Sequence, residues 1–229
     1  MKVIIPLKTN STRVPNKNLR PFHGGRSLFD IRAAQLRRVF PPEDVYVSSE
    51  LPAVESIAAG YNFRFLLREE RLTHNETPFD EVIDAIFAHI PGDDDLLWTS
   101  VTDPFFDGFP RVAMTWQEVD RTKYDSLLVV RPLRAFILDE HGRPINHGFG
   151  PWHVTSQGLD SLLTHNFACQ IVTRAAACRC RYVFGARPYL FHWTGPEADI
   201  DTMDDFRRAQ ILYEELQPFT GDCPNFRGP

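Results

Sequence analysis

Four cations lie within thirteen residues near the N-terminus: Lys8, Arg13, Lys17 and Arg20. The small polar residues between them leave backbone N–H groups free to face an anion. Fixed cations stabilise the negative charge that a leaving pyrophosphate gains. The segment therefore indicates a triphosphate-binding loop, and the alternative is a solvated basic loop stiffened by prolines. It is not a Walker loop, because the required glycine spacing is absent.

A second constellation is the segment Asp199-Ile200-Asp201-Thr202. Residues two apart in an extended segment point to the same side, so both carboxylates should face one side while Ile200 packs on the other. Neighbouring carboxylates repel each other unless a cation lies between them, and Mg²⁺ prefers carboxylate and phosphate oxygens. Thr202 with Asp205 also resembles a capping box, so the alternative is that the segment only begins a helix.

Alternating strands and helices must position these groups. Apolar runs predict strands, and capping signals with helical periodicity predict helices. This alternation predicts an α/β fold with a doubly wound, mainly parallel sheet, whose ligands lie beyond the carboxyl ends of the strands. The expected strands are 3–5, 45–47, 63–67, 96–98 and 126–130, and the expected helices are 28–40 after Ser27, 54–60, 77–90 and one after Thr202.

Composition limits the class of protein. The 229 residues suit a single domain, 1–229, in which the less regular range 133–190 could be an inserted lobe, a lid or a dimer arm. A net charge of −5 gives no general attraction to nucleic acid or to an acidic membrane. The chain has no long apolar stretch, CxxC pair or HExxH motif. We therefore expect a cytoplasmic protein without a zinc site.

Both constellations resemble motifs of the CMP-acylneuraminate synthetase family of cytidylyltransferases. That family's loop reads roughly I-P-A-R-x-x-S-K-x-x-P-x-K-N, and its D-I-D-T segment is matched literally about 180 residues later. Lys8 stands where the family has arginine, and Thr12 where it has lysine. The loop positions in register are Ile5, Pro6, Ser11, Pro15, Lys17 and Asn18.

This resemblance implies roles for individual residues. Lys8, Ser11 and Lys17 would contact the triphosphate, Asn18 would help to recognise cytosine, and Asp199 with Asp201 would bind Mg²⁺. Lys8, Lys17 and Asp201 are the expected catalytic residues. Arg68, after a strand, and Thr102, in a V-T-D-P-F segment resembling the family's V-T-S-P-F, are further candidates. The whole expected nucleotide set is Lys8, Asn10, Ser11, Arg13, Lys17, Asn18, Arg68 and Thr102.

Two departures from the family pattern concern the metal and the acceptor. Asp103 replaces the family's serine, and it is either a third metal ligand or a residue that caps a turn. Asn166-Phe167-Ala168-Cys169-Gln170 stands in place of an N-G-A-Φ-Y segment, so the acceptor pocket should be altered. The candidate acceptor contacts are Gln157, Asn166 and Gln170.

The function that the resemblance implies is Mg²⁺-dependent transfer of CMP from CTP to a small acidic sugar of the nonulosonate or KDO type, by a homodimer. A first alternative acceptor is a phosphonate or another phosphorylated small acid, which would need several cations from the middle of the chain. A second alternative is a non-catalytic nucleotide-binding protein on the same fold. The cations to inspect are Arg131, Arg134, Arg143, Arg174, Arg179, Arg181 and Arg187.

Overall fold

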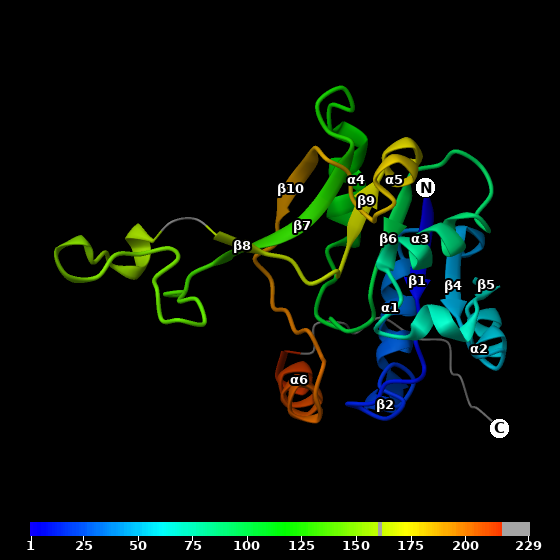
Figure 1. Ribbon diagram of the computed structural model, residues 1–229. Helices are drawn as coiled ribbons and strands as arrows, with labels where there is room; N and C mark the ends of the chain where they lie inside the picture. The colour runs from blue at the N-terminus through cyan, green and yellow to red at the C-terminus, as the bar shows by residue number, and fades with distance from the viewer. Residues whose placement is uncertain (160–161, 217–229) are drawn as a thin grey trace.

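The computed structural model describes residues 1–159 and 162–216, and a central sheet of eight strands organises them. The strand order is β10-β7-β9-β6-β1-β4-β5, with β8 paired to β7 (Figure 1). The glycine and proline content of residues 218–229 predicts an irregular tail, which lies outside the described residues. The strands of this sheet are β1 Lys2–Pro6, β4 Val45–Ser49, β5 Arg64–Leu67, β6 Leu96–Trp98, β7 Ser126–Leu133, β8 Leu162–Thr164, β9 Gln170–Val172 and β10 Pro188–His192.

The sheet is mainly parallel, which confirms the predicted fold class. β1 pairs in parallel with β4 and β6, β4 with β5, and β7 with β10. β9 lies antiparallel between β6 and β7. A separate two-stranded ribbon, β2 Pro21–His23 and β3 Arg26–Ser27, follows the N-terminal loop.

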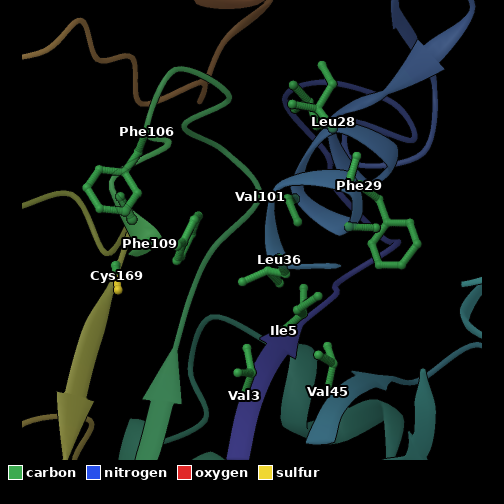
Figure 2. Packing of buried hydrophobic residues seen from close by; sticks show 14 of the residues in the cluster. Val3, Ile5, Leu28, Phe29, Leu36, Val45, Val101, Phe106, Phe109 and Cys169 are labelled. Atoms are coloured by element: carbon green, nitrogen blue, oxygen red, sulfur yellow. The ribbon is translucent and has the colours of Figure 1, made fainter. Parts of the chain in front are cut away.

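Helices cover both faces of the sheet. Ile4 belongs to one buried cluster with residues of α3 and α5, whereas Val3 and Ile5 belong to a second cluster with α1, α2, α4 and α6. Figure 2 shows this second cluster, in which Leu36 of α1 approaches Ile5 and Phe109 lies near Cys169. The helices are α1 Leu28–Arg37, α2 Val54–Gly60, α3 Phe79–Phe87, α4 Phe109–Glu118, α5 Arg174–Cys180 and α6 Met203–Leu216, with short 3-10 turns Pro42–Asp44, Glu70–Thr73, Gly150–Trp152 and Ser156–Gly158.

Capping explains where α1 begins. The Ser27 side chain accepts a hydrogen bond from the Asp30 amide, which confirms the predicted cap, and Asp30 accepts one in return from the Ser27 amide. α3 is shorter than the predicted range 77–90, because Pro78 precedes it without a side-chain cap and the helix ends at Phe87. Helix α4 was not expected, since glycine and proline occupy its start.

The middle of the chain divides into two parts. Residues 134–159 extend away from the sheet as an arm (Figure 1). β9, α5 and β10 instead belong to the main fold, with β9 at the centre of the sheet. The arm is therefore shorter than the range 133–190 that we considered for an inserted lobe. Within the described residues, no helix is long and apolar enough to cross a membrane.

Candidate active site

The N-terminal loop and the D-I-D-T segment meet in space. Lys17 Nζ lies 3.2 Å from Asp201 Oδ1, and Arg13 Nη2 lies 3.0 Å from the same oxygen. Lys17 Nζ also donates a hydrogen bond to the carbonyl oxygen of Ile200. In Figure 1, the segment that leads from β10 into α6 runs on the side of the sheet where β1 ends. Two motifs 184 residues apart therefore form one site.

Backbone hydrogen bonds fold the N-terminal loop back on itself. The side chain of Val14 is fully buried and anchors the middle of the loop. The Lys17 amide donates to the Val14 carbonyl oxygen, and Asn18 Nδ2 donates to the Lys8 carbonyl oxygen at 2.8 Å. Asn16 takes a left-handed backbone conformation with φ of 53°, which asparagine tolerates better than most residues. These contacts direct Lys17 toward Asp201.

The D-I-D-T segment has the predicted alternation. Ile200 is fully buried, and its amide donates to the Thr102 carbonyl oxygen at 3.1 Å. Burial raises the pKa of Asp199 and the charge of Asp201 adds to this effect, although a hydrogen bond with the Thr102 side chain opposes it. The Thr202–Asp205 capping box is present at the start of α6. Capping and carboxylate presentation therefore coexist in this segment.

The carboxylates fit a divalent cation that shares phosphate ligands. Within the described residues, no group of three or more His, Cys, Asp or Glu side chains could hold a metal ion. Asp199 and Asp201 lie close enough for the charge of one to raise the pKa of the other. Two carboxylates completed by phosphate oxygens and water suit Mg²⁺, which rarely uses an all-protein cage.

A cavity of about 410 Å³ lies beside the loop. Its walls include two cations, Lys8 and Arg68, and the threonines Thr73 and Thr77. The Lys8 ammonium also lies 3.2 Å from Asn75 Oδ1. An apolar wall completes it, formed by Leu72, Phe79, Val82, Trp98 and Phe167. This combination of cations, polar groups and aromatic rings suits a ligand that has both an anionic part and a ring.

Glu50 connects Arg68 to the N-terminal loop. Its carboxylate accepts hydrogen bonds from the Thr9 amide and hydroxyl at 2.7 and 2.6 Å, and Arg68 Nη2 lies 3.7 Å away. Burial acts to raise the pKa of Glu50, but the bonds from Thr9 and the charge of Arg68 outweigh it and lower that pKa. No role was expected for Glu50 from the sequence. Its position directly after β4 is the signal that could have found it.

The other predicted nucleotide residues lie along the same loop. Asn10 Nδ2 donates to Thr73 Oγ1 at 2.8 Å, and Ser11 Oγ accepts a weak bond from the Val14 amide at 3.4 Å. Asn18 is buried, and its Oδ1 has no hydrogen-bond partner. The loop thus carries these predicted residues at the end of the sheet where β1 terminates.

Asp103 is not placed as a metal ligand. Its side chain is buried, with Oδ1 accepting hydrogen bonds from the Phe105 and Ala198 amides and Oδ2 accepting one from Asn166. Burial raises the pKa of Asp103 to about 6, opposed mainly by the charge of Arg32. Because protein donors contact both oxygens, the structure favours a positioning role for Asp103 over that of a third metal ligand.

The three candidate acceptor residues do not form one pocket. Gln157 is an exposed residue of the arm, whereas Gln170 is fully buried in β9 at the centre of the sheet. Asn166 is engaged with Asp103 and the Ala168 amide. The structure separates these candidates, since β9 belongs to the main sheet and carries Gln170 away from the arm.

One family model matches the N-terminal part of the chain, which contains the basic loop. Residues 2–102 match a family model described as Cytidylyltransferase. This segment is similar to the cytidylyltransferase family. The match confirms the resemblance and the expectation of an enzyme that transfers cytidylyl groups. It includes the loop, Arg68 and Thr102, and it ends before the D-I-D-T segment. No curated protein matches the chain in sequence.

Solved structures share the whole fold. A CMP:2-keto-3-deoxy-manno-octonic acid synthetase, solved in complex with CTP, covers 93% of this chain and 98% of its own with a TM-score of 0.64 at 13% identity. A putative glucose-1-phosphate thymidylyltransferase from Bacillus anthracis covers 96% and 97% with a TM-score of 0.66 at 12% identity. A 4-diphosphocytidyl-2C-methyl-D-erythritol synthase from Anaerococcus prevotii covers 93% and 96% with a TM-score of 0.57 at 12% identity. At these identities the likeness establishes the fold.

Proposed function

We propose that the protein transfers CMP from CTP to a small acidic sugar of the nonulosonate or KDO type and releases pyrophosphate. One observation carries the proposal: Arg13 and Lys17 of the cytidylyltransferase loop both contact Asp201 of the D-I-D-T segment. Cations for a leaving pyrophosphate and carboxylates for a divalent cation are thereby side by side. The structure of a CMP:2-keto-3-deoxy-manno-octonic acid synthetase, which shares the fold, supports the choice of acceptor class.

The cavity beside the loop is the proposed nucleoside site. Its apolar wall would accept the pyrimidine ring, while Lys8 at its edge would direct the phosphates toward Lys17. Arg68 is almost fully buried and its Nε has no hydrogen-bond partner, so it has a free donor to offer a ligand. The unpaired Oδ1 of buried Asn18 is a second unused polar atom, which supports its proposed part in base recognition.

The chemical step is an in-line displacement. A hydroxyl oxygen of the acceptor forms a bond to the α-phosphorus of CTP, and the bond between the α-phosphorus and the bridging oxygen to the β-phosphate breaks. The hydroxyl proton passes to the acceptor's own carboxylate or to solvent, since no general base is identified among the residues that the structure describes. Lys8, Arg13 and Lys17 would neutralise the leaving pyrophosphate, so positioning and charge stabilisation supply the catalysis.

Asp199 and Asp201 are the proposed holders of Mg²⁺. When bound, the ion would screen the negative charge of the phosphates. The protein contributes the orientation of both carboxylates, because Ile200 between them is buried and its amide is bonded to Thr102. Two retained carboxylates favour an enzyme over the alternative of a non-catalytic nucleotide-binding protein.

The arginines of the middle region favour a carboxylate acceptor over a phosphonate. Four of the seven contact groups of the main fold: Arg174 contacts the Phe87 carbonyl, Arg179 and Arg187 contact Asp125, and Arg181 pairs with Asp80 and Asp84. Arg143 pairs with Asp139 within the arm. Arg131 is 3.0 Å from Glu197. Arg134 lines a small cavity with Gln157 and His192 and has no ion-pair partner within the described residues. A doubly charged phosphonate would need more than this single unpaired cation.

The arm is the proposed dimer contact. Large apolar side chains are exposed along it, and Trp152 is 76% exposed. Such a series on an extended arm favours burial against another surface. A second copy of the chain is the proposed partner. The exposed apolar residues are Phe136, Leu138, Ile145, Phe149 and Trp152.

Pyrophosphate release tests the proposed reaction. The protein is incubated with CTP and Mg²⁺ and with either nonulosonic and octulosonic acids or small phosphonates. We expect release only with the sugar acids, and we expect Asp201→Asn to abolish it. Asp204→Asn is the matched control, because Asp204 is exposed on α6 and outside the site. Release with phosphonates alone would replace the acceptor class, and release with neither would contradict the proposed transfer.

A further inference from the structure

The buried carboxylate of Asp103 connects three segments of the chain. Oδ1 accepts hydrogen bonds from the Phe105 and Ala198 amides, both at 3.1 Å, and Oδ2 accepts one from Asn166 Nδ2 at 2.8 Å. Ala198 directly precedes Asp199, and Asn166 directly precedes Phe167, which lines the cavity beside the loop. One side chain therefore touches both the carboxylate segment and the segment that forms the cavity wall.

Further hydrogen bonds join the loop after β6 to the carboxylate segment and to the segment that contains Phe167. The Ile200 amide donates to the Thr102 carbonyl oxygen, so the carboxylate segment is bonded to residues 102 and 103 in succession. At the other end, the Ser100 amide donates to the Phe167 carbonyl oxygen at 3.0 Å, and Asn166 Oδ1 accepts from the Ala168 amide. The loop after β6 thus lies between the two halves of the site.

A buried cation holds this loop in place. Arg32 of α1 is 1% exposed, and its guanidinium donates to the carbonyl oxygens of Ser100, Asp103 and Phe106. Its charge also stabilises the Asp103 carboxylate, which burial alone would disfavour. A carboxylate at this position is therefore partly compensated, and it supplies more acceptor capacity than the serine that stands here in the family this chain resembles.

We propose that Asp103 is a positioning residue that fixes the separation between the metal-binding carboxylates and the nucleoside cavity. This inference rests on the proposed function of both sites. A metal–CTP complex spans the two sites and needs them in register, whereas a nucleotide without metal needs only the cavity and the loop. Asp103 itself touches neither ligand, since protein donors occupy its oxygens.

A charge-swap pair tests the proposal without deleting the side chain. In Asp103→Asn, the amide nitrogen faces Asn166 Nδ2, so two donors meet and the bond to residue 166 is lost. Adding Asn166→Asp restores one donor and one acceptor, and the new carboxylate can still accept from the Ala168 amide. Asp107→Asn is the matched control, because Asp107 lies in the same loop and pairs with Arg38 instead.

Calorimetry of CTP binding, with Mg²⁺ and with EDTA, provides the main measurement. For Asp103→Asn we expect about a tenfold rise in Kd for Mg²⁺–CTP, the usual size for a lost buried bond, with the metal-free Kd changed less than about twofold. The swapped double variant should recover most of the loss, and Asp107→Asn should show none. Equal weakening with and without metal, no weakening, or a double variant that fails to recover would each overturn the proposal.

Amide hydrogen exchange separates this inference from the proposed function. Asp103→Asn should accelerate exchange in residues 166–168 or 198–201, and the double variant should reverse the change. If the wild-type protein bound no CTP, the proposed function would fail, yet exchange would still show whether Asp103 joins the two segments. Unchanged exchange at both segments would refute the positioning role whatever the protein binds.

Discussion

Lys17 and Arg13 contact the same oxygen of Asp201, and burial predicts that they differ in importance. The Lys17 side chain is 11% exposed and the Arg13 side chain is 63% exposed, while Asp201 is 44% exposed. Exposed ion pairs contribute at most about 1 kcal/mol, whereas breaking a buried pair costs about 3–5 kcal/mol. Because Asp201 is partly solvated, we expect Lys17→Met to lower the free energy of unfolding by about 2 kcal/mol, between these limits.

Urea unfolding with an unchanged m-value measures this difference. Arg13→Met is the matched control, and it should cost less than about 1 kcal/mol. For a chain of this size, the Lys17 loss corresponds to a fall in Tm of about 4–8 °C. Raising the salt concentration should weaken the Arg13 contact more than the Lys17 contact, because exposed pairs are screened. An equal or larger loss for Arg13→Met would refute the argument from burial.

Three further predictions concern Asp103, Arg68 and the arm. Burial raises the pKa of Asp103 to about 6. Between about pH 4 and 6 the native state therefore holds the Asp103 proton more tightly than the unfolded state does. The protonated carboxyl contributes about 3 kcal/mol to the free energy of unfolding at low pH, and this contribution is lost as the pH rises through 6. Unfolding at pH 4 and pH 7 should show this loss in the wild-type protein relative to Asp103→Asn, and a pH-independent difference would contradict it. Arg68→Met should raise the Kd for CTP about tenfold or more, because the cavity loses a buried cation; calorimetry that gives an unchanged Kd would exclude Arg68 from the nucleotide site. Trp152→Glu should convert a dimer to a monomer in sedimentation, and a wild-type protein that is already monomeric would contradict the dimer proposal.

The sequence predicts those strands in which consecutive residues are buried. β1, β4 and β6 lie inside the sheet with neighbours on both sides, so each appears in the sequence as a short apolar run. β9 was missed, because it has three residues and begins with the polar Gln170. Local sequence did not indicate that a short segment from the irregular region returns to the centre of the sheet.

The site was predictable in its parts, and its assembly came from the resemblance. Residue types alone indicated a basic loop and a carboxylate pair, and the structure adds the contact between Lys17 and Asp201. Asp103 shows why the rest could not be predicted. Its hydrogen-bond partners Ala198 and Asn166 are 95 and 63 residues away in the sequence. No local pattern therefore distinguishes a buried carboxylate that holds other segments in place from one that binds a metal.

Nucleotide selectivity distinguishes a CTP-dependent enzyme from a protein that binds nucleotides in general. Binding of CTP, ATP, GTP and UTP is measured by calorimetry with Mg²⁺, first for the wild-type protein and then for Asp199→Asn. We predict that CTP binds at least about tenfold more tightly than the other three, a difference of about 1.4 kcal/mol, and that Asp199→Asn weakens Mg²⁺–CTP binding while sparing metal-free CTP. Equal binding of all four nucleotides, or binding of none, would contradict the assignment of CTP as the substrate.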